Sequence, residues 1–520
     1  MKFDRTKNAS RNIIFGLIQK LYQILVPFIM RTAMIYLLGV EYLGLDSLFT
    51  SILSVLNLAE LGVGTAMVYN MYKPIVDDDK STICALMRLY MIYYRIIGGV
   101  ILVGGLILCP FVPKLISGSI PDDLNIYILF LLNLGATVLS YWLFAYKNCL
   151  LQAYQRSDVV SKITMFITTV KYLLQFILLF IFSNYYYYLI VTLAMQAIQN
   201  IITAIIASSM FPDLRAEGKL SKAKIKEVNT RIRDLFTAKL GSVVVNSVDT
   251  LVISAFLGLT ILAVYQNYYY VVTAVIGIIN ILIYSCTATV GNSIIVETKS
   301  KNFEDLKTFT FLIVGIGSLC ANCMLCVFQP FMELWVGKEL MFEFPVVICF
   351  TIYFFVFVIN TLLIMYKDAA GIWHEDRFRP LVTATSNLIM NLLMVQFLGI
   401  YGILLSTVLS MIFVGMPWLI HNLFSILFDK KELKGYVFKL LNYSISAFFI
   451  CVISYWIGVY IPFQGILLII SRVIICCIIT FIWFILCYHR SSEFTKSILI
   501  LNKITKGKLK LNKLFNFNQK

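Results

Sequence analysis

The stretch that decides the fold is RNIIFGLIQKLYQILVPFIMRTAMIYLLGVEYLGLDSLFTSILSVLNLAELGVGTAMVYNMYKP, residues 11–74. It contains two apolar runs, 13–38 and 43–69, and each is long enough to cross about 30 Å of hydrocarbon as a helix. The strands of a membrane barrel are instead about ten residues long and alternate in polarity. The stretch therefore predicts two transmembrane helices joined by a short turn.

The rest of the chain repeats this pattern. Of the 520 residues, 60% are hydrophobic and 13% are charged, and this charged fraction is about half that of a soluble protein. A soluble protein and a disordered chain are both excluded, because neither could be built with so little charge. We predict an all-α polytopic membrane protein with about fourteen transmembrane helices. Their predicted ranges are 13–38, 43–69, 84–109, 125–146, 159–182, 186–210, 235–258, 262–290, 308–328, 345–366, 381–398, 401–424, 441–461 and 466–488.

The net charge of +16 is distributed unevenly. With the N-terminus placed in the cytoplasm, 33 of the 43 Lys and Arg residues fall in cytoplasmic segments and two, Lys114 and Lys338, in outer loops. Cytoplasmic loops of membrane proteins are enriched in Lys and Arg. The excess of positive charge therefore indicates how the chain is oriented in the membrane, and it does not indicate nucleic-acid binding. We predict a multi-pass protein of the bacterial cytoplasmic membrane with both termini in the cytoplasm. The first apolar run is too long for a signal peptide, so no cleavage is expected.

An internal repeat predicts the domain organisation. RTAMIYLLGVEYLGLDSLF from Arg31 resembles DTLVISAFLGLTILAVYQNYY from Asp249 when Gly39 is aligned with Gly258, an offset of 219 residues. Chance similarity between two helix ends rich in Leu and Gly is the alternative. We expect two six-helix bundles at 1–210 and 235–424, a basic linker at 211–234, extra helices 13 and 14 within 425–488, and a basic cytoplasmic tail at 489–520. Apolar residues at helical spacing in the linker predict a basic amphipathic helix on the inner leaflet.

Several cations lie inside the predicted spans, where a charge is costly and needs a reason. Arg31, Arg95 and Lys171 lie deep, which favours a function, whereas Lys20 and Arg88 lie close enough to the inner boundary to extend towards water. Arg and Lys bind diphosphate, and polar stripes on neighbouring spans would face a shared cavity or bond between helices. The predicted substrate-binding residues are Arg31, Arg88, Arg95, Lys171, Lys20, Asn246, Gln196 and Asn387.

Three further intramembrane charges have other predicted roles. Glu60 and Asp249 are candidate coupling sites for H⁺ or Na⁺, because burial raises the proton affinity of a carboxylate. Ion pairing with the nearby cations is the alternative for both. Arg472 lies in the last span and marks a predicted lipid-tail region.

No cofactor or metal site is predicted. Cys320, Cys323 and Cys326 have iron–sulfur spacing, but Pro330 stands near the position where the fourth cysteine would be. The three histidines are scattered, and no phosphate-binding loop of an ATP-driven pump is present.

Two segments carry a resemblance to a known family. The stretch 11–74 contains R-x7-G-x2-YLGL and ELGxGxAxxYxxYKP elements, and it resembles the opening of bacterial polysaccharide repeat-unit flippases of the Wzx type. AKLGSVVVNSVDTLVISAFLGLTILAVYQNYY, residues 238–269, resembles the seventh helix of that family. These flippases belong to the multidrug/oligosaccharidyl-lipid/polysaccharide exporter superfamily. The resemblance implies alternating access by two six-helix bundles, with an undecaprenyl-diphosphate-linked oligosaccharide as substrate.

Other functions remain open from the sequence. Fourteen spans also resemble the lipid II flippase branch, in which an extra helix pair forms a groove for the lipid tail. A multidrug exporter of the same superfamily is a further alternative, although a cation exporter should have an acid-rich cavity. A membrane glycosyltransferase or polysaccharide polymerase belongs to another class, and such a polymerase is also an expected partner of a flippase. The short outer loops, without paired carboxylates, disfavour the enzyme.

Overall fold

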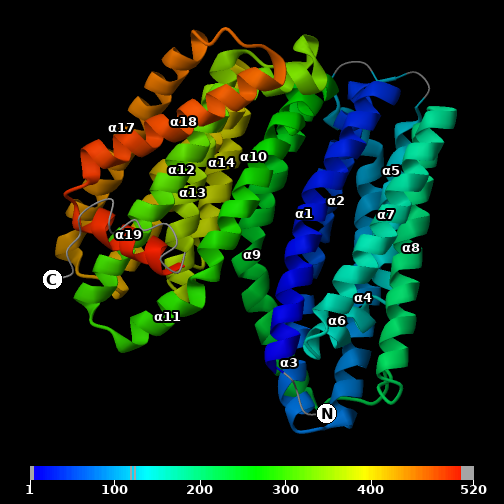
Figure 1. Cartoon of the computed structure of the whole chain (residues 1–520). Coiled ribbons are helices and arrows are strands. Elements are labelled where there is room, and N and C mark those ends of the chain that lie inside the picture. The colour runs from blue at the N-terminus through cyan, green and yellow to red at the C-terminus, as the bar shows by residue number, and fades with distance from the viewer. Residues whose placement is uncertain (1–4, 118–119, 122–123, 505–520) are drawn as a thin grey trace. The chain divides into compact units, whose positions relative to one another are not determined.

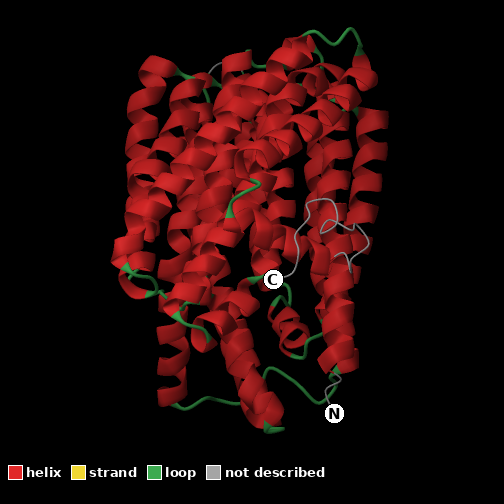
Figure 2. Cartoon of the chain, turned by 60° about the vertical axis from the view of Figure 1, so that its left-hand side comes forward, coloured by secondary structure: helices red, strands yellow, loops and turns green. Residues whose placement is uncertain are grey.

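The computed structural model describes residues 5–117, 120–121 and 124–504, without the side chains of 5–17, 234–235, 237–246, 288 and 500–504. All regular secondary structure in these residues is helical (Figure 2). The predicted fold class is therefore confirmed. By its internal contacts the chain forms two compact units, Met1–Gln266 and Asn267–Lys520, called here the N-terminal and C-terminal units. The finer domain boundaries predicted above stay predictions.

In its described residues, the N-terminal unit contains nine α-helices and the start of a tenth, which Figure 1 shows with their labels. They are α1 (Arg5–Leu37), α2 (Val40–Leu56), α3 (Val63–Val76), α4 (Lys80–Leu108), α5 (Ile126–Trp142), α6 (Tyr146–Ala153), α7 (Ser157–Phe182), α8 (Tyr185–Met210), α9 (Lys222–Leu257) and α10 (Leu259–Ser285). Some of the main packing pairs are consecutive helices, such as α7 with α8. Others are far apart in the sequence, such as α1 with α7 and α2 with α9.

The C-terminal unit contains the rest of α10 and the remaining helices. They are α11 (Thr287–Val296), α12 (Lys299–Val336), α13 (Phe344–Ala369), α14 (Arg379–Leu398), α15 (Ile400–Ser410), α16 (Met416–Ile426), α17 (Leu433–Val459), α18 (Gly465–Tyr488) and α19 (Ser492–Ile504). Between α15 and α16 the chain forms a π-helical turn, Met411–Gly415, so the two helices make one continuous segment. The predicted extra pair, α17 and α18, packs on α12 together with α19.

Most of the predicted spans coincide with long apolar helices. In the described residues, eleven helical segments are long and apolar enough to cross a membrane, or twelve if α5 and α6 form one bent span. The first and seventh predicted spans, 13–38 and 235–258, coincide with α1 and α9. The chain is therefore a multi-pass membrane protein, and about fourteen spans agree with its helices.

Two spans are broken, and hydropathy alone did not predict the breaks. A short 3-10 turn, Asn57–Glu60, separates α2 from α3, and Gly62 after it has φ 87°, a conformation that favours glycine because it has no Cβ. Helices α5 and α6 meet at 53°, where Phe144 has φ 55°. Both breaks lie in the N-terminal unit and expose polar groups inside it.

The helix corners at Gly39 and Gly258 are alike, as the repeat predicts. Each glycine has a positive φ, 127° and 90°, and separates two helices. Glu41 Oε1 and Thr260 Oγ1 lie 3.3 Å apart, and these two residues are separated by the same 219 positions as the glycines. The two corners therefore have the same local conformation and contact each other.

The predicted basic amphipathic helix of the linker is the start of a longer helix. Its residues form the first turns of α9, a single helix of 36 residues that starts at the Ser221 N-cap. Val228 is fully buried, and the Arg231 guanidinium lies 4.2 Å from the centre of the Tyr69 ring. Because α9 packs against α3 in this region, Val228 is covered by protein, and the position of the segment on the inner leaflet stays a prediction.

Candidate functional site

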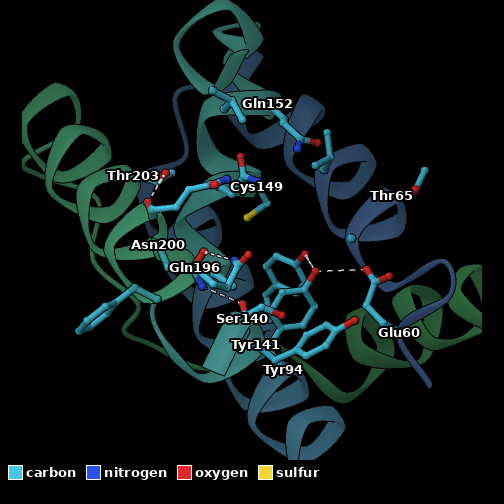
Figure 3. A pocket seen from close by; sticks show the side chains of 18 of the residues that line it. Glu60, Thr65, Tyr94, Ser140, Tyr141, Cys149, Gln152, Gln196, Asn200 and Thr203 are labelled. Atoms are coloured by element: carbon cyan, nitrogen blue, oxygen red, sulfur yellow. Dashed lines mark hydrogen bonds between the residues drawn. The ribbon is translucent and has the colours of Figure 1, made fainter. Parts of the chain in front are cut away.

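A polar cavity of about 470 Å³ lies inside the N-terminal unit. The turn after α2 and the start of α3 form one side, α4, α5 and α6 line the middle, and α8 forms the opposite side. Figure 3 shows Glu60 and Tyr94 across the cavity from Gln196 and Asn200. The two helix breaks open this space, since a continuous α2–α3 or α5–α6 helix would fill it with its own turns. We call it the amide–tyrosine cavity.

Tyrosines and Glu60 form one wall. Tyr90 Oη donates to Tyr94 Oη at 2.5 Å, and Tyr94 Oη donates to Glu60 Oε1 at 3.2 Å. The Tyr141 ring packs edge-on against Tyr94 with ring centres 5.3 Å apart. Gly64 allows this close approach, because a Cβ there would lie 3.0 Å from Tyr90 Oη and 3.2 Å from Glu60 Oε1.

Amides form the facing wall. Gln196 Nε2 donates to Asn200 Oδ1 at 3.3 Å, and Asn200 Nδ2 donates to the Ser140 carbonyl at 2.9 Å. Asn148, at the start of α6, places its Oδ1 in a buried position where no described residue donates to it. Buried polar atoms normally have a partner, so this oxygen is an acceptor that a ligand could use.

The cavity is poor in charge. Among the described residues that line it, Glu60 is the only carboxylate and none is Lys or Arg. The other polar groups are amides and hydroxyls, which bind neutral polar ligands through directional hydrogen bonds. No group of three or more His, Cys, Asp or Glu residues in the described part of the chain could hold a metal ion.

A second polar cluster, also in the N-terminal unit, brings together two of the predicted cations. Arg31 on α1 and Lys171 on α7 both interact electrostatically with Asp46 on α2. Tyr185, at the start of α8, donates from Oη to Asp46 Oδ1 at 3.2 Å, and Lys171 Nζ lies 4.4 Å from the centre of the Tyr172 ring. The sequence placed Arg31 and Lys171 on separate helices, and the fold brings them to one carboxylate. We call this group the Arg31–Lys171 cluster.

The other predicted cations of the N-terminal unit do not join this cluster. Arg88 Nη1 donates to the Gly218 carbonyl at 2.9 Å, so it holds the segment before α9. Arg95 is exposed on α4, and Lys20 is exposed on α1. Asp249 is buried on α9. The side chain of Asn246 lies outside the described residues.

In the C-terminal unit, Asn387 lies in a buried hydrogen-bonded group. Its Nδ2 donates to Thr407 Oγ1 at 3.0 Å, and its Oδ1 accepts from Asn391 at 3.4 Å. The bond to Thr407 joins α14 to α15, which is the interhelical role that the sequence left open, and the bond from Asn391 lies within α14. Gln175 does the same between α7 and α8, where its Nε2 donates to Thr192 Oγ1 at 2.8 Å.

Arg472 lies where α18 meets α12. Its Nη1 donates to the Cys326 carbonyl at 2.8 Å, and its side chain passes beside Gly458 of α17. Further along α18, an apolar groove of about 620 Å³ runs between α12, α18 and α19. Phe311, Phe481 and Phe484 line this groove.

Sequence reasoning missed two features. Asp376 makes a two-pronged ion pair with Arg379, at 2.6 and 2.9 Å, and both side chains are buried between α13 and α14. The amide–tyrosine cavity was also missed apart from Glu60 and Gln196. Its residues come from several helices, and hydropathy does not predict how those helices pack. The spacing of Tyr90 and Tyr94 by one helical turn was a usable signal, because it places both on one face of a helix.

The solved structures with this fold are membrane transporters. The chain is similar to a structure described as "Lipid II flippase MurJ, inward closed conformation", with a TM-score of 0.67, 14% identity, and coverage of 92% of this chain and 99% of that one. It is also similar to an inward-facing multidrug resistance MATE family transporter of the MOP superfamily, with a TM-score of 0.57 and 16% identity over 80% of this chain and 96% of that chain.

A third similar structure is a MOP superfamily transporter from Pyrococcus furiosus, with a TM-score of 0.50, 11% identity, and coverage of 83% of this chain and 97% of that one. No protein-family model and no curated protein sequence matches the chain. The sequence identities are low, so these similarities show the fold alone. The chain has the fold of transporters of the MOP superfamily.

Proposed function

We propose that the protein is a flippase for oligosaccharides linked to a polyprenyl diphosphate, such as undecaprenyl diphosphate, in the synthesis of a surface polysaccharide. The observation that carries the proposal is the Arg31–Lys171 cluster, a net positive group inside a membrane bundle. The fold similarity to a lipid II flippase over 92% of the chain and the Wzx-like motifs in residues 11–74 support it.

The diphosphate would bind the cations. Arg31 and Lys171 share Asp46, which neutralises one of their two positive charges. An arriving diphosphate would find an attractive net charge and two groups suited to phosphate oxygens, a planar guanidinium and a compact ammonium. Arg95, which is exposed on α4, would attract the headgroup, with Arg88 and Lys20 as weaker contributors.

The remaining predicted roles follow the same scheme. Gln196, Asn246 and Asn387 would contact sugars, and Glu60 or Asp249 would bind a coupling H⁺ or Na⁺. The prenyl chain would stay in lipid and lie along the groove formed by Phe311, Phe481 and Phe484, beside α18, which also carries Arg472.

Location and partners are part of the proposal. The asymmetry of Lys and Arg supports a multi-pass protein of the bacterial cytoplasmic membrane with both termini in the cytoplasm. Substrate would enter from the inner leaflet and leave to the outer leaflet, where a polysaccharide polymerase would receive it.

A reconstituted system tests the function. Purified protein in liposomes should move a fluorescent undecaprenyl-diphosphate oligosaccharide between leaflets, measured by its accessibility to a membrane-impermeant quencher. The double variant Arg31→Gln/Lys171→Gln should slow this movement by at least about tenfold, since losing two charge-assisted hydrogen bonds removes about 3 kcal/mol or more. Lys338→Gln, an exposed cation paired with Glu333 at 3.3 Å, is the matched control. Equal rates in the double variant and the control would reject the cation site.

A second candidate function, export of organic cations, also has a specific observation behind it. Glu60 and the tyrosines beside it offer a carboxylate and aromatic faces, which together attract quaternary ammonium groups. Efflux of such a cation from the same liposomes, with no movement of the lipid-linked sugar, would favour this function.

A further inference from the structure

The amide–tyrosine cavity is chemically different from the Arg31–Lys171 cluster. Among its described lining residues no Lys or Arg is present, and the single carboxylate, Glu60, would repel a diphosphate. A cavity of about 470 Å³ lies within the range of about 300–1,000 Å³ that is usual for small-molecule sites. It therefore needs a ligand that is neutral, polar and small.

The amide wall has unused hydrogen-bonding capacity. Asn148 Oδ1 is buried without a donor among the described residues, and leaving such an acceptor unpaired costs about 1–3 kcal/mol. Gln196 uses one N–H on Asn200, and a primary amide has a second N–H and a carbonyl oxygen. Side-chain amides can donate and accept at once, which is the pattern that two adjacent sugar hydroxyls present.

The tyrosine wall supplies the complementary surface. The Tyr94 ring packs against Tyr90 at 4.2 Å and against Tyr141 at 5.3 Å between ring centres, so these rings support each other. A tyrosine offers an apolar face together with a polar tip. A pyranose ring has the same division, with C–H groups on one face and hydroxyls at its edge.

We propose that the amide–tyrosine cavity binds one neutral pyranose unit of the transported oligosaccharide. Asn148 and Gln196 bind its hydroxyls, and the tyrosines pack against its ring. This inference rests on the proposed function, because it assigns the cavity to a part of the same substrate. The two polar sites of the N-terminal unit then divide the headgroup: the cation cluster takes the diphosphate and the cavity takes a sugar.

An organic cation is the competing ligand for the cavity. Glu60 is its only described acidic group, and it already accepts a hydrogen bond from Tyr94. The wall facing it is built of neutral amides and hydroxyls, including Gln196, Asn200 and Ser140, which a cation would leave unused. The count and placement of neutral polar groups thus favour a sugar.

Direct binding tests the inference. The purified full-length protein in detergent is mixed with methyl glycosides of glucose, galactose, rhamnose, N-acetylglucosamine and N-acetylgalactosamine, and separately with choline. Binding is measured by saturation-transfer NMR titration. We expect at least one glycoside to bind, and Asn148→Leu/Gln196→Leu to weaken it by about tenfold or more, as the loss of two neutral hydrogen bonds predicts.

Matched variants keep the test decisive. Gln396→Leu makes the same change at an exposed position of α14 and should bind the glycoside like the unmodified protein. If the double variant does not fold, as judged by size-exclusion chromatography, the variant Gln196→Asn is used in its place. This substitution keeps the amide group and shortens the side chain by one methylene.

Three results would overturn the proposal. The first is an equal glycoside affinity in the double variant and in Gln396→Leu. The second is that no glycoside binds. The third is that choline binds while no glycoside does, and that Glu60→Gln abolishes the binding of choline. A failure of the proposed function looks different. The glycoside would then bind and depend on Asn148 and Gln196, while the liposomes would not translocate the lipid-linked oligosaccharide.

Discussion

At the scale of single residues, the charged side chains in the predicted spans differ in the partner that each one contacts. Arg31 and Lys171 both interact electrostatically with Asp46, whereas Arg88 donates a hydrogen bond to a backbone carbonyl of the segment before α9. The sequence predicted only that a cation inside a membrane span has a functional or structural reason to lie there. It could not predict which reason applied to each, because a cation and its partner lie on different helices whose packing the sequence pattern does not give.

The uncharged site residues were harder to predict. Asn200 lies one helical turn after Gln196 on α8, but Asn148 belongs to the short helix α6, and only the fold brings the two asparagines to the same cavity. Glu60 and Gln196 were predicted as separate sites, one for an ion and one for a sugar. The structure places both in the lining of one cavity.

Gly64 provides a residue-scale prediction. In Gly64→Ala the new methyl group would lie 3.0 Å from Tyr90 Oη and 3.2 Å from Glu60 Oε1, and such overpacking costs about 1–3 kcal/mol. We expect transport in liposomes to fall by about tenfold as the tyrosine wall shifts, at normal expression. Gly99→Ala on α4 is the control, because a Cβ at Gly99 meets nothing within 4 Å. Equal transport in both variants would contradict the prediction.

At the scale of helices, hydropathy predicted the spans well and their breaks poorly. The predicted range 159–182 nearly matches α7 (Ser157–Phe182), because a long apolar run between polar ends forms a single helix in a membrane. The break at Gly62 depends on one left-handed backbone conformation, which leaves the average hydropathy of the span unchanged. The amphipathic segment before 235 was predicted without its continuation into the next span, because nothing in its composition shows that one helix, α9, runs through both.

The last helix, α19, provides a prediction about pH. Lys439 hydrogen-bonds Glu493, and Lys496 Nζ lies 2.6 Å from Glu304 Oε2 of α12. Burial is the largest single influence and favours a raised pKa for Glu493, but the hydrogen bond from Lys439, a backbone hydrogen bond and the charges of Lys439 and Lys307 together hold the pKa below the ordinary value of 4.5. A depressed folded-state pKa means that this contact stabilises the docked helix above about pH 4.5, and that the stabilisation is lost as the pH falls through the lower value.

Amide hydrogen exchange measures this docking. At pH 7, Glu493→Gln should increase exchange in residues 492–499 by several-fold, because it removes the charge that Lys439 pairs with. Glu333→Gln removes an exposed partner of Lys338 and should leave these residues protected, since exposed pairs contribute about 0–1 kcal/mol. Unchanged exchange in Glu493→Gln would show that apolar packing alone holds α19.

At the scale of the whole molecule, the chain combines a fold shared with known transporters and two polar sites within one unit. The sequence predicted an all-helical membrane protein because composition and run length leave few other structures possible. It could not give the substrate, since the same fold occurs in structures described as a lipid II flippase and as multidrug transporters. We propose that the cation cluster binds the diphosphate and that the cavity binds a sugar. Variants of these two sites can therefore distinguish a lipid-linked oligosaccharide flippase from a multidrug exporter.

Topology gives a prediction at this scale. Alkaline phosphatase, which is active outside the cytoplasm, should be active when fused after residues 115, 341 or 462, and a fluorescent protein that matures in the cytoplasm should fluoresce when fused after 216, 297, 373 or 430. The physical reason is the asymmetric placement of Lys and Arg. Phosphatase activity at any of the second set would refute the predicted orientation.

The contacts that hold the segment before α9 have a consequence for how the protein is made. Lys80 Nζ bonds Asp213 at 2.9 Å and Arg88 bonds the Gly218 carbonyl. During synthesis, before α9 exists, the positive charges beside a nascent span can act only on the insertion machinery and the membrane potential. Once the later segment emerges, Arg88 holds it through the Gly218 carbonyl, and Lys80 adds an exposed ion pair that contributes about 0–1 kcal/mol. A loss of function on replacing Arg88 therefore has two origins to separate: the insertion of the nascent span, and the attachment of this segment in the finished protein.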